Sequence, residues 1–218
     1  MGMTFKRKKY LVIKNVITKN MANFIYDYFS MKRRVAKKLL AERYISPFDD
    51  TWGTWGDDQV PNTYSHYSDL VMEALLEKVK PIMEKKTKLK LIPTYSFARL
   101  YKKGDVLKRH KDRFSCEIST TMFLGGEPWD IYLEPNKNVG KRPEGPYVPT
   151  TNKGIKVSLK PGDMMIYSGC ELEHWREAFQ GTNCCQVFLH YNQSSSPGAM
   201  ENRFDTRPFL GLPNWFKK

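Results

Sequence analysis

Tyr101-Lys-Lys-Gly-Asp-Val-Leu-Lys-Arg-His-Lys-Asp112 is the stretch of sequence that decides the architecture of this chain. It predicts one strand, a turn at Gly104-Asp105 and a second strand that ends in His110 and Asp112. Residues i and i+2 of an extended segment point to the same face, so the imidazole and the carboxylate converge without special backbone geometry. The stretch therefore predicts two consecutive strands and the first two ligands of a metal site.

A third candidate ligand, His174, follows another turn and strand signal, Lys160-Pro-Gly-Asp163-Met-Met-Ile-Tyr167. The chain has only four histidines, so finding two of them in this pattern is informative. Two histidines and one carboxylate can cap one face of an octahedral metal ion and leave other positions open, as in non-haem iron(II) oxygenases. The same ligand types also hold catalytic zinc. The chain has no His-Glu-x-x-His motif, which argues against a zinc protease.

From about residue 91 onward, short β-rich runs alternate with turn residues. The expected strands lie at 93–103, 106–110, 115–124, 129–134, 155–159, 163–167, 173–177 and 184–192. Several short strands at this spacing predict a sandwich or a barrel. Before them, a strand is expected within 8–17, and apolar residues at helical spacing predict helices over 19–41 and 67–86.

We expect a single domain over residues 1–218. Residues 1–90 form its helical support region, residues 91–192 its β-rich core and residues 193–218 its C-terminal tail. Two irregular segments, 46–65 and 135–154, are long enough to be functional loops.

Composition narrows the class of protein further. The formal net charge of +13 favours solubility or an acidic partner, either nucleic acid or an acidic polypeptide. The four cysteines form no Cys-x-x-Cys pair, which fits a reducing compartment, and we expect a cytoplasmic protein. The chain has no apolar stretch of 18 residues, so no membrane span is expected.

Taken together, the order of these motifs resembles a known family. The motifs are Tyr101-x-x-Gly104-x-x-Leu107-x-x-His110-x-Asp112, then Pro161-Gly162-Asp163, His174 and Gly181-Thr182. Over residues 91–192 they are similar to the 2-oxoglutarate- and iron(II)-dependent dioxygenases, in particular the prolyl 4-hydroxylase-like branch. The resemblance implies an α+β fold, a double-stranded β-helix (jelly roll) with flanking N-terminal helices. It also implies that His110, Asp112 and His174 bind Fe(2+).

The implied activity is hydroxylation of a C–H bond with O2 and 2-oxoglutarate, which releases succinate and CO2. Tyr101 falls where the family places a tyrosine that hydrogen-bonds the cosubstrate carboxylate. The usual Arg or Lys nine to ten residues after the second histidine is absent, since Asn183 and Cys184 stand there. Arg176 and Arg99 are candidate replacements for binding the distal carboxylate, and Asn183 could still donate a neutral hydrogen bond.

The substrate is predicted less sharply than the metal site. Base-repair relatives carry an Arg-x-x-x-x-x-Arg pair after the second histidine. Here Arg176 has no arginine partner at that spacing, so a peptidyl substrate, with proline as a candidate, ranks above a nucleobase. A free amino acid or a small metabolite stays open. The alternative is a non-catalytic metal-binding module that binds nucleic acid or an acidic protein through its basic surface, which the missing basic residue favours. His190, within an apolar run, indicates a core histidine.

Overall fold

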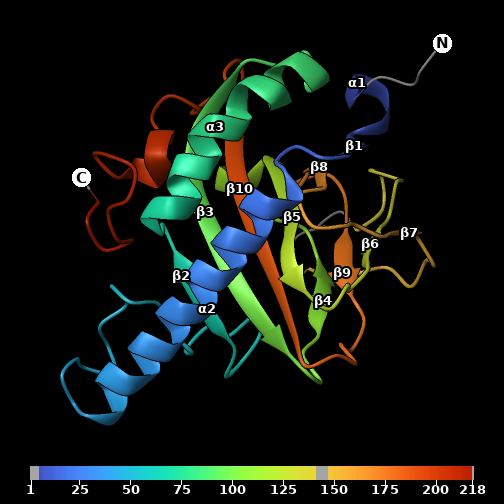
Figure 1. Cartoon of the computed structure of the whole chain (residues 1–218). Coiled ribbons are helices and arrows are strands. Elements are labelled where there is room, and N and C mark those ends of the chain that lie inside the picture. The colour runs from blue at the N-terminus through green and yellow to red at the C-terminus, as the bar shows by residue number, and fades with distance from the viewer. Residues whose placement is uncertain (1–4, 141–146, 218) are drawn as a thin grey trace.

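The computed structural model describes residues 5–140 and 147–217, in which two antiparallel sheets face each other (Figure 1). The larger sheet has the order β1-β8-β5-β10-β3-β2, and the smaller has the order β4-β9-β6-β7. The strands of the larger sheet are β1 (Tyr10–Ile13), β2 (Tyr64–Tyr67), β3 (Leu91–Lys102), β5 (Ile118–Gly126), β8 (Met164–Ser168) and β10 (Asn183–Gln193). Those of the smaller sheet are β4 (Leu107–His110), β6 (Ile131–Leu133), β7 (Ile155–Val157) and β9 (His174–Arg176). This strand order is the predicted jelly roll, and every strand expected from residue 93 onward is found.

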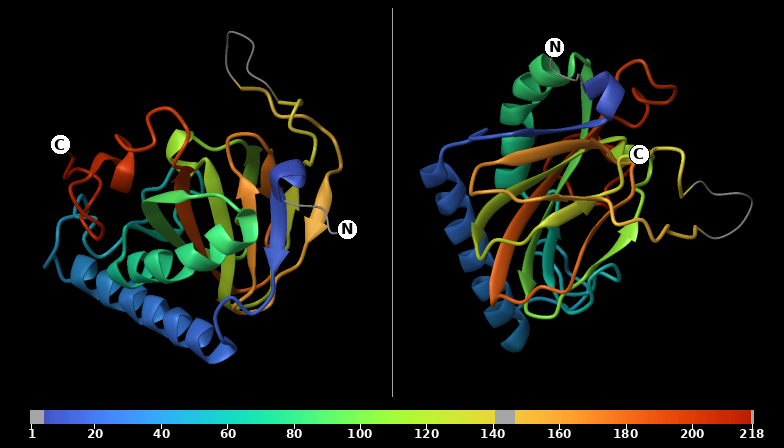
Figure 2. Two further views of the ribbon diagram at one scale, coloured as in Figure 1. Left: turned by 90° about the horizontal axis from the view of Figure 1, so that it is seen from above. Right: turned by 90° about the vertical axis from the view of Figure 1, so that its right-hand side faces the viewer.

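The helices cover the outer face of the larger sheet. They are α1 (Phe5–Lys8), α2 (Lys19–Ala41) and α3 (Leu70–Thr87), with short 3-10 turns η1 (Phe114–Cys116) and η2 (Arg203–Thr206). Figure 2 shows α2 and α3 side by side against that face. The hydroxyl of Thr18 accepts a hydrogen bond from the first turn of α2, and the carboxylate of Asp69 does the same for α3.

The first 90 residues contribute strands as well as helices. β1 pairs with β8 at one edge of the larger sheet, and β2 pairs with β3 at the other. The prediction was wrong about where the third helix begins: it starts at Leu70 and not at residue 67, because Tyr64–Tyr67 extend along β3. Part of the predicted loop 135–154, residues 141–146, lies outside the described residues.

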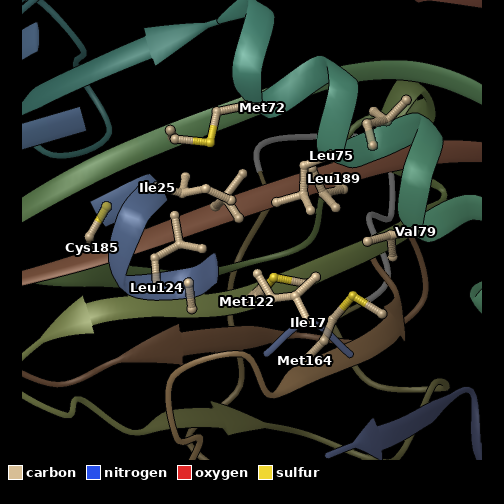
Figure 3. Close-up of a cluster of buried hydrophobic side chains, with 14 of the residues drawn as sticks. Ile17, Ile25, Met72, Leu75, Val79, Met122, Leu124, Met164, Cys185 and Leu189 are labelled. Carbon is tan, nitrogen blue, oxygen red and sulfur yellow. The ribbon is translucent and has the colours of Figure 1, made fainter. Parts of the chain in front are cut away.

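The larger sheet is buried on both faces, and alternation along each strand divides the side chains between two layers. On β5, Met122 and Leu124 pack against the helices, whereas Phe123 points into the space between the sheets. Figure 3 shows this helical layer, in which Ile25 and Leu75 lie close to the sheet. The helical layer thus packs against one face of the larger sheet. The other face of that sheet can line a site inside the roll.

No helix among the described residues has the length and apolar character needed to cross a bilayer. The cytoplasmic location stays a prediction.

Candidate active site

The two candidate histidines meet because β4 and β9 are neighbours in the smaller sheet. His110 and His174 are directly opposite each other in the ladder, and their ring centroids are 4.2 Å apart. Asp112 lies just past the end of β4, where its backbone N–H donates to the carbonyl of Gly169 over 2.9 Å. Its Oδ1 is 3.3 Å from the Nε2 atom of each histidine. The structure therefore brings the three predicted ligands together.

Backbone carbonyls hold both imidazoles in one orientation. The Nδ1 of His110 is 2.7 Å from the carbonyl of Lys108, and the Nδ1 of His174 is 3.1 Å from that of Leu172. Because a carbonyl can only accept, each Nδ1 must donate, and in a neutral imidazole the Nε2 then carries a lone pair. Two nitrogen lone pairs and a carboxylate oxygen thus converge on one point, which is the arrangement that a metal cation requires.

The charges at this point are strongly coupled. Burial opposes ionisation of Asp112, but His174 and His110 hold the pKa of that carboxyl well below its usual range. Burial likewise opposes protonation of His110, yet hydrogen bonding and charge from Asp112 raise its pKa. The carboxylate is therefore ionised and makes the point between the three side chains favourable for a cation.

Arg176 lies on the same face of β9 as His174 and is fully buried. It donates from Nη1 to the carbonyl of Trp129 and from Nη2 to the hydroxyl of Thr121 over 3.1 Å. Its Nε has no hydrogen-bond partner, and no carboxylate within residues 5–140 and 147–217 forms an ion pair with it. Burial lowers its pKa, because desolvation penalises the charged form. The Asp130 carboxylate acts on this charge from a distance without forming an ion pair with it. A buried guanidinium that is not ion-paired is costly, so this group is suited to bind an anion.

The other predicted cosubstrate residues have different surroundings. Arg99 is buried on β3 but already pairs with Asp57, 2.6 Å away, and donates to the Tyr101 hydroxyl over 3.2 Å. Tyr101 is fully buried and lies between this arginine and the Trp129 ring. Asn183 is not brought into the site, because its Oδ1 accepts from Tyr26 of α2 on the opposite face of the sheet. We therefore drop Asn183 as a candidate for binding 2-oxoglutarate.

Two adjoining hollows meet at the candidate ligands. A cavity of about 360 Å³ runs between the sheets, and a wider hollow of about 900 Å³ opens beside it. His110 and Asp112 line both. The inner walls of the first are largely aromatic, being formed by Tyr95, Phe97, Tyr167 and Phe188. The wider hollow is polar and carries Lys111, Arg113, Lys137, Tyr147 and Glu171.

Sequence reasoning missed one segment that reaches the ligands. Gln59, within the predicted irregular segment 46–65, places its amide nitrogen 3.2 Å from the Nε2 of His110. Its side-chain oxygen accepts from Arg99 over 3.2 Å, beside the Asp57 ion pair. The length of the segment was the only signal in the sequence, and it did not indicate which residue would enter the site.

No protein-family model and no curated protein sequence matches this chain. Solved structures do match it in fold. A prolyl-4-hydroxylase from Pseudomonas putida aligns with a TM-score of 0.56 and 12% identity, over 88% of this chain and 96% of that one. The viral collagen prolyl hydroxylase of Paramecium Bursaria Chlorella virus-1, in complex with 2-oxoglutarate, gives 0.53 and 11%, over 85% and 97%. HygX from Streptomyces hygroscopicus, with nickel, 2-oxoglutarate and hygromycin B bound, gives 0.56 and 12%, over 88% and 85%. The likeness is one of fold.

Proposed function

We propose that this chain is an iron(II)- and 2-oxoglutarate-dependent dioxygenase that hydroxylates a C–H bond. The observation that carries the proposal is the convergence of His110, Asp112 and His174, with both histidine Nε2 atoms turned toward the carboxylate. This donor set fits iron(II), because it provides one negative charge and leaves coordination positions for other groups. That the matched viral hydroxylase and HygX were crystallised with 2-oxoglutarate supports the choice of cosubstrate.

When bound, iron would supply the activation of O2. The electrons would come from the oxidative decarboxylation of 2-oxoglutarate to succinate and CO2 and from the C–H bond that is hydroxylated. The residues of the protein would hold the metal ion and orient its ligands. Lys108 and Leu172 fix the two imidazoles through their carbonyls, and the aromatic walls of the inner cavity limit the access of water.

Arg176 is our candidate for binding the distal carboxylate of 2-oxoglutarate. It is buried, shares a face of β9 with His174 and has no carboxylate partner among the described residues, whereas Arg99 is already paired with Asp57. Thr121 and Tyr101 add hydroxyl groups near it. A charge-assisted contact at this position would replace the basic residue that is missing at Asn183 and Cys184. A replacement of this kind also weakens the case for a non-catalytic binding module, because that case depended on the missing basic residue.

For the substrate we propose a peptidyl group, with proline as the first residue to test. Two of the matched structures are prolyl hydroxylases, and the wider hollow beside the ligands is large enough for a peptide segment. Lys111 and Lys137 on its wall favour an acidic peptide, whereas Arg113 is already paired with Asp205. The hygromycin B bound to HygX makes a small-molecule substrate the comparison to run alongside.

The test is whether the purified protein turns 2-oxoglutarate into succinate when iron(II) and oxygen are present. Anaerobic addition of iron(II) and then 2-oxoglutarate should give a weak visible charge-transfer band. His110→Ala and Asp112→Ala should each abolish both signals, while Lys108→Ala, which keeps the backbone carbonyl, should retain them. A band that persists in both ligand variants would show that the metal site lies elsewhere. No succinate above the metal-free control would favour the binding module.

A further inference from the structure

Behind Asp112, on the side away from the histidines, a buried hydroxyl connects it to a third imidazole. The Oγ of Ser119 is 2.8 Å from Oδ2 of Asp112 and 3.0 Å from Nδ1 of His190. Ser119 on β5 and His190 on β10 are direct partners in the larger sheet, and both are buried. His190 also lines the inner cavity. It is buried in the core, as its apolar neighbours in the sequence indicated, but it also faces the candidate site.

Counting protons gives the direction of these hydrogen bonds. Ser119 has one hydroxyl hydrogen, and its possible acceptors are Asp112 and the carbonyl of Cys116, each 2.8 Å away, and Nδ1 of His190, 3.0 Å away. The ionised carboxylate is the stronger acceptor, so the hydroxyl donates to Asp112. Its oxygen must then accept from His190, whose Nδ1 therefore carries a hydrogen. Burial lowers the pKa of His190 to about 4, so the ring is neutral near pH 7.

The two oxygens of Asp112 thus have separate partners. Oδ1 faces the Nε2 atoms of His110 and His174, and Oδ2 accepts from Ser119. The final torsion of an aspartate has broad minima, so a carboxylate without such a contact can rotate between orientations. A hydrogen bond to one oxygen leaves the other directed at the metal position.

The surroundings leave little room for this arrangement to change. A side chain at Gly169 would place its Cβ 2.3 Å from Oδ2 of Asp112 and 2.8 Å from the Ser119 hydroxyl. The His190 ring packs against Tyr95, with centroids 4.6 Å apart. Both ends of the hydrogen-bonded series are therefore held by packing.

A second reading of the same residues is a separate metal site. Asp112, Cys116 and His190 have ligand atoms within 4.8 Å of one another. However, burial raises the pKa of the Cys116 thiol well above its usual range, and this sulfur is 3.0 Å from the Tyr95 hydroxyl. A protonated thiol is a poor ligand, and the Nδ1 of His190 is already used by Ser119. The geometry favours a supporting role.

We propose that His190 is a positioning residue that acts through Ser119 to orient Asp112, and that it thereby sets the affinity of the site for a divalent metal. This inference rests on the proposed function, since it takes Asp112 to be a metal ligand. Partners behind a metal ligand typically change metal affinity by about 10- to 100-fold when removed.

The test is a double-variant cycle in which cobalt(II) alone is titrated by calorimetry. Wild type, Ser119→Ala, His190→Phe and the double variant are compared, because phenylalanine fills the ring volume but cannot donate. We expect each single variant to bind cobalt about 10- to 100-fold more weakly. If His190 acts through Ser119, adding His190→Phe to Ser119→Ala should change the affinity by less than about threefold. Independent, multiplying losses would overturn the proposal, as would a His190→Phe affinity equal to wild type.

A rescue variant separates positioning from packing. His190→Asn can place an amide N–H near the position of Nδ1, so it should bind cobalt within about threefold to fivefold of wild type although it is smaller. An affinity for His190→Asn as weak as that of His190→Phe would contradict donation to Ser119. If His190→Phe does not fold, the cobalt affinity of His190→Asn is compared with those of wild type and Ser119→Ala. An affinity near wild type supports donation to Ser119, and one near that of Ser119→Ala contradicts it. Wild type that binds no cobalt would overturn the proposed metal centre itself, whereas binding that is equal in all variants overturns only the role of His190.

Discussion

Along β10, the side chains that face the helices differ in kind from those that face the interior of the roll. Val187 and Leu189 point to the helices and are fully buried in the apolar layer. Gln186 and His190 point inward, where they hydrogen-bond to Thr121 and Ser119. One strand therefore supplies packing on one face and polar groups for the candidate site on the other. Substitutions on the two faces should affect different properties, and this separation can be tested.

The largest effect is expected inside the roll, at the metal. His174→Ala removes one of three candidate ligands, so metal affinity should fall by more than about 100-fold, beyond what supporting residues cause. The free energy of unfolding without metal should change by less than about 2 kcal/mol, because the helical layer is untouched. Calorimetric titration and urea unfolding measure the two quantities. A large loss of metal-free stability would break the separation between the faces.

The matched change on the helical face is Leu189→Ala. It deletes a fully buried side chain from the apolar layer, so the free energy of unfolding should fall by about 2 to 5 kcal/mol. The metal affinity of the folded fraction should stay within about threefold of wild type, since the inward-facing neighbours keep their partners. Urea unfolding followed by circular dichroism gives the first value. A parallel loss of metal affinity would show that packing is transmitted across the sheet.

Arg176 sharpens the comparison, because we expect this inward-facing residue to destabilise the folded protein and to strengthen the binding of 2-oxoglutarate. Arg176→Met removes a buried charge that is in no ion pair with the described residues, so the metal-free protein should become more stable by about 1 to 4 kcal/mol. Binding of 2-oxoglutarate should weaken by about 1.5 to 3 kcal/mol, through the lost charge-assisted contact. Arg99→Met is the control, and it should affect binding less, because Arg99 is paired with Asp57. The reverse ranking would assign the distal carboxylate to Arg99.

The last effect depends on pH and concerns the outer face of the smaller sheet. Burial opposes ionisation of Glu173, but hydrogen bonds from Thr150, Tyr147 and Arg109 lower its pKa to about 2. Because the folded-state pKa is below the unfolded value, the stabilisation is complete above about pH 4.5 and is lost as pH falls toward 2. Glu173→Gln should therefore cost up to about 3 kcal/mol at pH 7 and almost nothing near pH 2. Unfolding measured at several pH values tests this, and an offset that is constant with pH would contradict it.

The sequence was most informative where side chains are related by local spacing. His110 and Asp112 lie two residues apart at a strand end, so alternation predicted their convergence. His174 follows a turn and a short strand, and its place beside them was expected from the family resemblance. The strands themselves were predicted because each one is bounded by turn residues.

What could not be predicted depends on contacts between distant segments. The choice between Arg176 and Arg99 rests on Asp57, which comes from a segment with no regular pattern. Asn183 has the right position in the sequence but the wrong face, because the register of β10 directs it to Tyr26 of α2. Ser119 has no signature at all, since a serine that is followed in its strand by Thr120 and Thr121 gives no indication of its partner.

The pairing of β4 with β9 has a consequence for folding. The candidate ligands that lie opposite each other in it, His110 and His174, are separated in the chain by every strand from β5 to β8. Closing a loop of this length costs entropy before any contact repays it, and such non-local pairings form slowly. The ligand set is complete only in molecules whose roll has closed. A metal ion that binds only these molecules stabilises the folded state by mass action. Metal uptake during refolding would therefore measure the fraction of molecules in which the roll has closed.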